Sequence, residues 1–141
     1  MILTEDQIRE IAGQLDCGFR CFVHKQTREL IFIPDTIKNP DMDMEGWIEE
    51  NEKIENNFLD YFEIEPLESY NSFRIMEDFA ETLEDSNRLK ERLYEALNKR
   101  KPFRNFKNVI DYSGEYRQKW FDFKNQWLRD WVRKSIERIE E

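Results

Sequence analysis

The sequence predicts an α+β fold, with a small antiparallel sheet of about three strands in the N-terminal half packed against a helical C-terminal half. Runs rich in β-branched and aromatic residues lie before residue 66, whereas apolar residues recur at helical spacing after residue 70. Of the 141 residues, 39% are hydrophobic and 14% are aromatic, which is enough to build a core. We therefore expect one domain that spans residues 1–141.

The first helix is expected to follow Thr4, because its hydroxyl can accept a hydrogen bond from the backbone of Gln7 while the Gln7 side chain reaches back. Apolar residues then recur at helical spacing up to residue 15. Gly18 comes next, and glycine readily adopts the left-handed conformation that ends many helices.

Two runs of strand-forming residues, 19–24 and 29–33, flank a polar turn, and this arrangement predicts a β-hairpin. The later stretch DYFEIEPL alternates in polarity, with Phe62 and Ile64 expected to face the core. Pro66 is expected to end this third strand, since proline cannot donate a hydrogen bond to a sheet ladder.

Residues 35–58 form an acidic, linker-like segment in which residues 47–58 could make a weakly amphipathic helix. Two amphipathic helices are expected next, beginning near Asn71 or Ser72 and near Asp85 or Ser86. Their predicted core faces are Met76, Phe79, Ala80 and Leu83, then Leu89, Leu93, Ala96 and Leu97. A short helix is expected from Pro102, followed by a long one over residues 114–138.

The charge of the chain is divided between its two ends. Residues 1–98 hold 10 Lys and Arg against 24 Asp and Glu, whereas residues 99–141 hold 12 against 7. Arg117 and Lys124 fall within the wide apolar arc of the last helix, where an unpaired cation would be unfavourable. We therefore expect the two ends to complement each other within one molecule. The candidate buried ion pairs join Arg117 and Lys124 to Glu77, Asp78 and Glu81.

The stretch KRKPFRNFKNV, residues 99–109, interleaves cations with aromatic rings in a chain of net charge −9. Cations suit the C-terminal end of a helix, and the spacing of Phe103 and Phe106 points both rings at a core. Interleaved cations and rings are also typical of nucleic-acid and phosphate binding. The candidate residues for an anion or a partner are Arg100, Lys101, Arg104 and Lys107. A structural role is the favoured interpretation, and nucleic acid is the less favoured one because most of the chain is acidic and repels a polyanion.

The stretch DMDMEGWIEENE, residues 41–52, has the oxygen ligands and the glycine of an EF-hand calcium loop. The candidate metal ligands are Asp41, Asp43, Glu45 and Glu52. Glu45 is longer than the Asp or Asn usual at its position, and the residues before the loop do not form an entering helix. A solvated acidic linker is the alternative, and it is the favoured interpretation.

Catalysis finds little support in the sequence. The chain holds 1 His and 4 Gly, with no glycine-rich phosphate loop and no nucleophile motif, so we expect neither an enzyme nor a cofactor. No run of 18 apolar residues and no signal peptide is present, which predicts a cytoplasmic protein away from membranes. Cys17 and Cys21 lie too far apart along a strand to bridge, so both are expected to be reduced thiols, with zinc a weak alternative.

The segments SFRIMEDFAETLEDSNRLKERLYEAL, PFRNFKNVI and KWFDFKNQWLRDW together resemble a bacterial family known as uncharacterised protein family 0158. The matching residues are Met76, Glu77, Asp78, Phe79, Phe103, Arg104, Phe106, Lys107, Trp120 and Phe123. The chain departs from the family pattern at Lys101-Pro102, where a small or glycine-containing approach is usual, and at Asn108, where Asp is usual. The resemblance implies a bacterial cytoplasmic α+β protein and supplies no activity.

These observations favour a small, non-catalytic protein that acts by binding another protein, with a homodimer as an open alternative. Nucleic-acid or phosphate binding by residues 99–107 is the first alternative function, and calcium binding by residues 41–52 is the second. The sequence identifies neither the partner nor the biological role.

Overall fold

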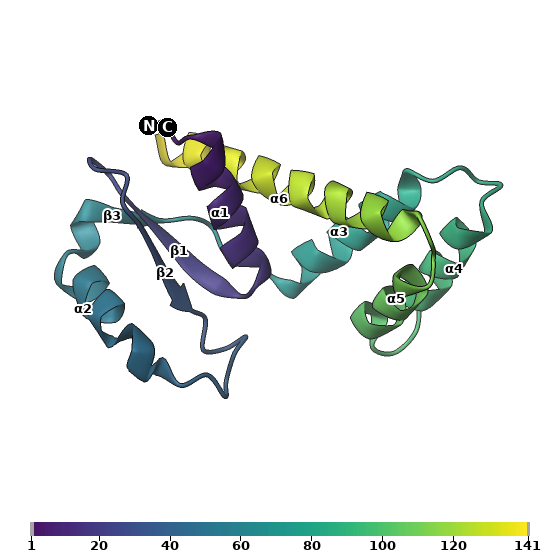
Figure 1. Cartoon of the computed structure of the whole chain (residues 1–141), viewed down its shortest axis with the longest axis horizontal. Coiled ribbons are helices and arrows are strands. Elements are labelled where there is room, and N and C mark those ends of the chain that lie inside the picture. The colour runs from purple at the N-terminus through teal and green to yellow at the C-terminus, as the bar shows by residue number, and fades with distance from the viewer. Residues whose placement is uncertain (1, 141) are drawn as a thin grey trace. The chain divides into compact units, whose positions relative to one another are not determined.

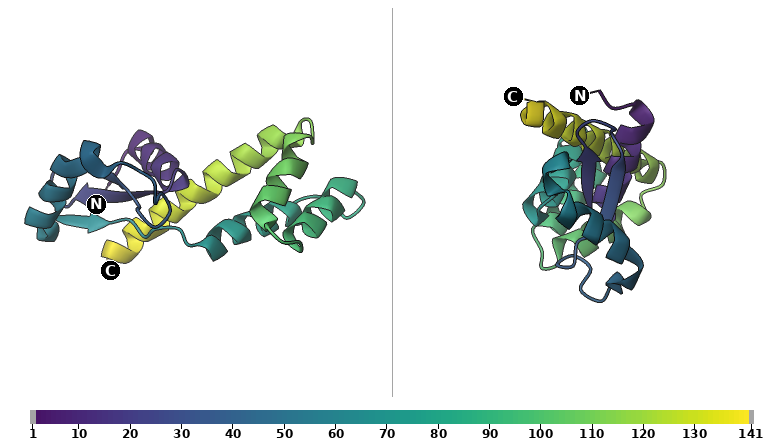
Figure 2. Two further views of the ribbon diagram at one scale, coloured as in Figure 1. Left: turned by 90° about the horizontal axis from the view of Figure 1, so that it is seen from below. Right: turned by 90° about the vertical axis from the view of Figure 1, so that its left-hand side faces the viewer.

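The computed structural model describes residues 2–140 and confirms the α+β class, with a three-stranded antiparallel sheet early and helices later. The chain forms two compact units. Unit 1 comprises the residues up to Pro66 together with the helical end from Leu128, and unit 2 comprises Leu67–Trp127. Helix α6 (Tyr116–Glu140) is one continuous helix that contributes residues to both units (Figure 1, Figure 2). The single domain expected from the chain length stays a prediction.

Unit 1 begins with helix α1 (Glu5–Asp16), and its start confirms the predicted capping box. The Thr4 hydroxyl accepts a hydrogen bond from the Gln7 backbone at 3.1 Å, and Gln7 Oε1 accepts one from the Thr4 backbone at 2.9 Å. Gly18 follows the helix with a φ of 80°, as predicted for a left-handed stop.

The sheet has the strand order β2-β1-β3, and both pairings are antiparallel. Its strands are β1 (Phe19–His24), β2 (Leu30–Pro34) and β3 (Tyr61–Glu63). The predicted hairpin is confirmed, with its second strand one residue later than expected. β1 therefore lies in the centre, and β2 forms one edge of the sheet.

Helices cover both faces of this sheet. Helix α1 packs against β1 on one face, where the thiol of Cys21 approaches the Ile11 carbonyl oxygen. On the other face, Ile31 belongs to a buried cluster that Ile54 of helix α2 (Ile48–Asn56) joins. Ile64, predicted to face the core, is fully buried directly after β3, whereas Phe62 is only partly buried and Tyr61 is buried as well. This difference arises because both faces of β3 are covered, so polarity alternation does not mark one inward side.

The acidic segment does hold the predicted helix. The segment contains two 3₁₀ turns, η1 (Met44–Trp47) and η2 (Phe58–Asp60), and α2 lies between them. No residue of α2 is fully buried, which agrees with its weak amphipathic pattern. The helix is held to the sheet by a few partly buried side chains such as Met44 and Ile54.

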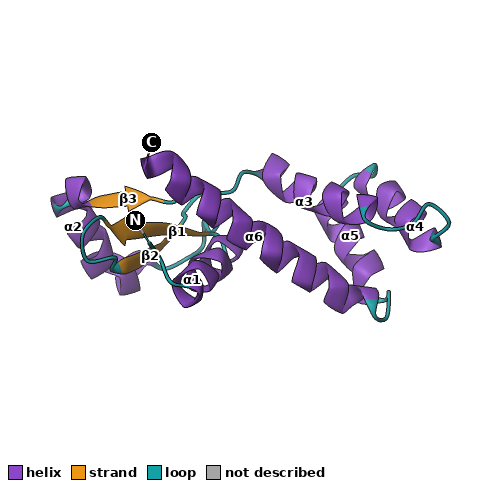
Figure 3. Cartoon of the chain, turned by 90° about the horizontal axis from the view of Figure 1, so that it is seen from above, coloured by secondary structure: helices purple, strands orange, loops and turns teal. Residues whose placement is uncertain are grey.

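Unit 2 is helical, with α3 (Ser69–Glu81), α4 (Arg88–Leu97), α5 (Pro102–Asp111) and the beginning of α6 (Figure 3). Its core contains an aromatic cluster in which the Trp120 ring packs edge-on against Phe79 at 5.4 Å and Phe106 at 4.9 Å. Phe123 meets Phe79 at 5.5 Å. Rings from the C-terminal segment therefore pack against a helix of the acidic first part, as the sequence predicts.

Two helix starts differ from the prediction by a few residues. Helix α3 begins at Ser69, because Glu68 and Asn71 form a reciprocal capping box. Helix α4 is capped by Asn87, whose side chain accepts a hydrogen bond from the backbone of Leu89. Asp85, one of the expected caps, instead accepts a hydrogen bond from Lys90 at 2.8 Å.

Candidate functional site

The free edge of β2 carries unpaired backbone groups. The backbone of His24 donates to the carbonyl of Glu29, and the same register runs along the whole β1–β2 pairing. Hydrogen-bonded and non-bonded residue pairs alternate in an antiparallel ladder. The backbone N–H and C=O of Ile31 therefore bond to β1, whereas those of Leu30 and Phe32 point away from β1. Among the described residues, β1 is the one strand that pairs with β2. The outward groups are therefore available to another extended chain.

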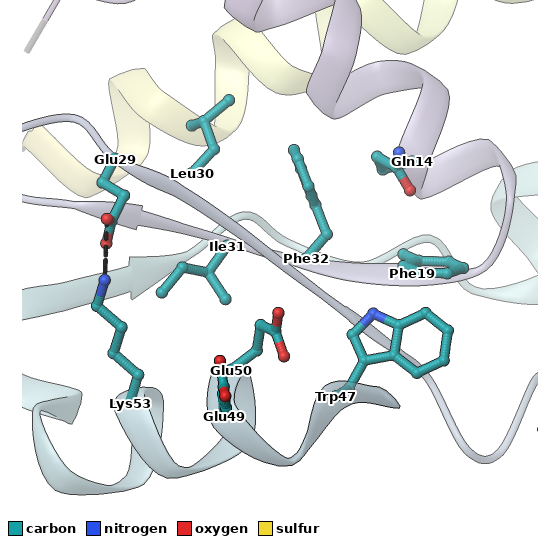
Figure 4. Close-up of a pocket in the computed structure, with 10 residues that line it drawn as sticks. All are labelled: Gln14, Phe19, Glu29, Leu30, Ile31, Phe32, Trp47, Glu49, Glu50 and Lys53. Carbon is teal, nitrogen blue, oxygen red and sulfur yellow. Dashed lines mark hydrogen bonds and ion pairs between the residues drawn. The ribbon is translucent and has the colours of Figure 1, made fainter. Parts of the chain in front are cut away.

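A cavity of about 510 Å³ lies along this edge, between β2 and α2 (Figure 4). Residues of α1, both hairpin strands, η1 and α2 line it. Its apolar wall includes Phe32 and Ile31, which extend from β2 on opposite faces of the sheet. Across the gap, Glu49 and Glu50 of α2 supply carboxylates. All of these residues belong to unit 1.

One end of the groove is closed by a polar contact. The Lys53 ammonium of α2 lies 2.7 Å from Glu29 Oε1 beside β2, and the Tyr61 hydroxyl donates to the same carboxylate at 2.7 Å. The hydrogen bonds from Lys53 and Tyr61 lower the pKa of Glu29 below its ordinary value. Burial, followed by the hydrogen bond to Glu29, raises the pKa of Tyr61.

The other end of the groove is aromatic. Trp47 at the end of η1 packs edge-on against Phe19 of β1, with ring centroids 5.9 Å apart. Both rings are partly exposed and line the cavity. The Phe19–Trp47 contact and the Lys53–Glu29 contact thus hold α2 to the sheet at two points, with the edge of β2 open between them (Figure 4).

Glu50 points from α2 into this space (Figure 4). Its Oε2 atom is buried and has no hydrogen-bond partner among the described residues. A buried polar atom without a partner costs free energy, so most such atoms in proteins are met by a protein group, a water or a ligand. The arrangement offers a ligand an unpaired backbone edge, an apolar wall and the half-buried carboxylate of Glu50.

The sequence-predicted basic residues lie in unit 2, around the turn between α4 and α5. All four are exposed, and none forms an ion pair with a described residue; they are Arg100, Lys101, Arg104 and Lys107. Phe106 is buried as predicted, but Phe103 is 39% exposed, which corrects its predicted place in the core. A short helix buries only one narrow stripe, and Phe106 with Ile110 occupies it.

The buried ion pair predicted between Arg117 and Glu77, Asp78 or Glu81 is a second correction, whereas the pairing predicted for Lys124 stays a prediction. Arg117 is more than half exposed and pairs with Asp111 at 3.5 Å. Lys124 lies over the ring of Phe121, with its Nζ 5.3 Å from the ring centroid. Asp78 pairs with Arg74 at 3.0 Å, and Glu81 lies 3.9 Å from Lys90. Asp78 and Glu81 therefore have cationic neighbours within the α3–α4 hairpin.

Charge complementarity between early and late residues does occur, within unit 1. Arg133 of α6 forms an ion pair with Glu5 of α1 at 2.6 Å, and Arg138 pairs with Glu65. The indole nitrogen of Trp131 donates to the Glu65 carbonyl at 2.8 Å. The general expectation is met here by Arg133 and Arg138, whereas Arg117 pairs with Asp111.

The predicted calcium ligands Asp41, Asp43, Glu45 and Glu52 are not gathered around a common point. Among residues 2–140, no group of three or more His, Cys, Asp or Glu is placed to hold a metal ion. Asp43 caps η1 instead, since its side chain accepts a hydrogen bond from the Glu45 backbone at 2.9 Å. The EF-hand pattern here is used for helix capping and surface charge.

The cysteines are free thiols, with Cys17 exposed and Cys21 buried. Burial raises the pKa of the Cys21 thiol, which makes it a poor nucleophile. His24 is engaged in the hairpin turn, where its Nδ1 accepts hydrogen bonds from the Gln26 and Thr27 backbones. The Cys21 thiol and the His24 ring are therefore engaged in contacts of the sheet and its hairpin turn.

Sequence reasoning missed the groove beside β2. Its residues come from five separate elements, and no motif joins them. The one local signal was Trp47 with Glu49 and Glu50, a large ring next to carboxylates in an otherwise weak helix. That signal was assigned to a calcium loop or a linker.

Comparison with known proteins identifies the family. The model of the Uncharacterised protein family (UPF0158) matches residues 1–140. The chain belongs to this family. It is 30% identical over 126 residues to UPF0158 protein PA5073 of Pseudomonas aeruginosa, a match that covers 89% of this chain and 76% of that protein. No solved structure matches the chain at a significant level.

The family description assigns no activity. Among the described residues, no helix combines the length and the apolar character that crossing a bilayer requires.

Proposed function

We propose that this family member is a non-catalytic cytoplasmic protein that binds an extended segment of another protein at the edge of β2. In such strand addition, main-chain hydrogen bonds supply affinity and pockets for alternate side chains supply specificity. The supporting observation is the outward-facing peptide groups of Leu30 and Phe32, beside a cavity of about 510 Å³. Exposed edge strands are usually shortened or covered, so an edge with a lined groove favours a partner.

A second copy of this chain is a poor occupant. Residues 29–60, which carry β2 and α2, hold 10 Asp and Glu against 2 Lys and Arg. Joining two β2 edges would bring these two acidic regions together, and like charges in contact are unfavourable. The partner is therefore a different protein.

Backbone-modified peptides test the proposal without changing the protein. The probe is acetyl-Thr-Val-Lys-Val-Thr-amide, in one version N-methylated at both valines and in another at the lysine and both threonines. Successive amides of a strand point to opposite sides, so one version keeps and the other loses the hydrogen bonds to β2. Calorimetric titration of the full chain should show binding of the unmodified peptide and of one methylated version.

Equal binding of both methylated peptides, or no binding of the unmodified one, would contradict strand addition. A matched pair of protein variants adds a second test. Leu30→Pro removes one outward N–H while Leu30→Ala keeps it, so only the proline variant should lose the peptide. Far-ultraviolet circular dichroism of each variant reports whether the fold is retained.

A second candidate function rests on the basic turn of unit 2. Arg100, Lys101, Arg104 and Lys107 are exposed, and the partly exposed ring of Phe103 lies among them in the sequence. Such a surface suits a phosphate-rich ligand. Electrophoretic mobility of single-stranded and duplex probes over a salt series tests it, and unchanged migration at low salt would eliminate it.

A further inference from the structure

We infer that the segment that adds to β2 presents a lysine or arginine side chain to Glu50. This inference rests on the proposed strand addition and names the chemistry of the partner. It is carried by the half-buried Glu50 carboxylate, which lies in the groove beside the free edge and whose Oε2 atom has no hydrogen-bond partner among the described residues.

The pleat of the sheet decides which side chain of the partner reaches Glu50. Ile31 extends from β2 toward α2, whereas Leu30 and Phe32 extend toward the opposite face (Figure 4). Directly opposite residues in paired strands point to the same face, about 4.5–5.5 Å apart. The partner residue beside Ile31 therefore extends over α2, where Glu50 lies.

The surroundings of Glu50 select a long cation. A lysine or arginine stem is apolar, so it can lie along Ile31 while its charged end meets the carboxylate. Glu49 lies next to it on α2 and lines the same cavity, which adds negative charge. Glu29 is not available in the same way, because Lys53 and Tyr61 already bind it.

The carboxylates of the groove are not a metal site. No set of three such ligands converges among residues 2–140, so a chelated ion is not favoured. An ammonium or guanidinium needs only one or two acceptors with the correct geometry. An extended segment with a basic side chain would bind both the outward backbone groups of β2 and the Glu50 carboxylate.

Two peptides that differ only in charge test the inference. Acetyl-Thr-Val-Lys-Val-Thr-amide is compared with the version that has norleucine in place of lysine, which keeps a similar stem without the ammonium. The wild-type chain should bind the lysine peptide about tenfold tighter, as expected for one charge-assisted hydrogen bond. Glu50→Gln should remove this preference, and the matched variant Glu49→Gln should keep most of it.

The outcomes separate the two proposals. Equal affinity of the wild-type chain for both peptides would overturn the role of Glu50 and leave strand addition standing. Binding of neither peptide would overturn both. Thermal unfolding gives a further readout, because a residue kept for binding rather than for folding should leave Glu50→Gln at least as stable as the wild type. A strongly lowered melting temperature in Glu50→Gln would contradict the inference by giving Glu50 a structural role.

Discussion

The indole ring of Trp47 stands edge-on to the phenyl ring of Phe19, with an interplanar angle of 71° and 5.9 Å between ring centroids. This contact joins the acidic helical segment to the central strand. We expect a double-mutant cycle with Trp47→Ala and Phe19→Ala to give a coupling of about 0.5–1.5 kcal/mol in the free energy of unfolding. Chemical denaturation measures it, and strictly additive effects would show that the two rings do not support each other.

At the opposite end of the groove, the Lys53–Glu29 contact should make stability depend on pH. The pKa of Glu29 is lowered in the folded chain, so its contribution is complete above the ordinary pKa of 4.5 and is lost as the pH falls through the folded value. Glu29→Gln should therefore flatten the fall of the unfolding free energy below about pH 4.5. Lys53→Met removes the same contact and should flatten it too. A variant as acid-sensitive as the wild type would refute the assignment.

The hydroxyl of Tyr94 in α4 should lose its proton only well above the usual pH for a tyrosine. Burial, a hydrogen bond to Glu81 and the negative charges of Glu77 and Asp85 raise its pKa to about 12. The stabilising contribution is present below the ordinary value of 10 and is lost as the pH rises toward 12. Absorbance at the tyrosinate wavelength should show a transition near pH 12 that Tyr94→Phe removes, while the raised titration of Tyr61 remains. If that transition persists in the variant, it belongs to another tyrosine.

Lys101 precedes Pro102 with a φ of 54°, in the left-handed region that glycine occupies without strain. Replacing it with glycine should stabilise the fold by up to about 1 kcal/mol, because relief of strain exceeds the entropy gained by the unfolded chain. Lys99→Gly is the matched control, since Lys99 has no positive φ, and it should destabilise or do nothing. Thermal melts compare the two variants, and a less stable Lys101→Gly would be evidence against the strain.

The sequence was informative where the structure depends on residues that are close together along the chain. The capping box at Thr4, the hairpin over 19–34 and the helix from Pro102 are all local, and each was predicted correctly. Ion-pair partners were not predictable, because several acids could have reached Arg117 and only the tertiary structure places Asp111 beside it. Phe103 also depended on tertiary packing, which left room for only one ring of the pair.

The groove itself could not be read from the sequence. Its free edge exists because β3 pairs on the far side of β1, a matter of strand order that no local pattern specifies. The Glu50 oxygen without a hydrogen-bond partner depends on how α2 lies against the sheet, whereas the sequence shows Glu50 only as one acid among many. In the same segment, the spacing of the acids and of Gly46 indicated a calcium loop or an acidic linker instead.

Amide hydrogen exchange in unit 1 tests the central claim most directly. In the free chain, the amides of Ile31 and Ile33 should be protected by β1, whereas those of Leu30 and Phe32 should exchange quickly. Saturation with acetyl-Thr-Val-Lys-Val-Thr-amide should slow Leu30 and Phe32 and leave the other two unchanged. Unchanged fast exchange at Leu30 and Phe32 in the presence of bound peptide would contradict the account, because the ligand would then lie elsewhere.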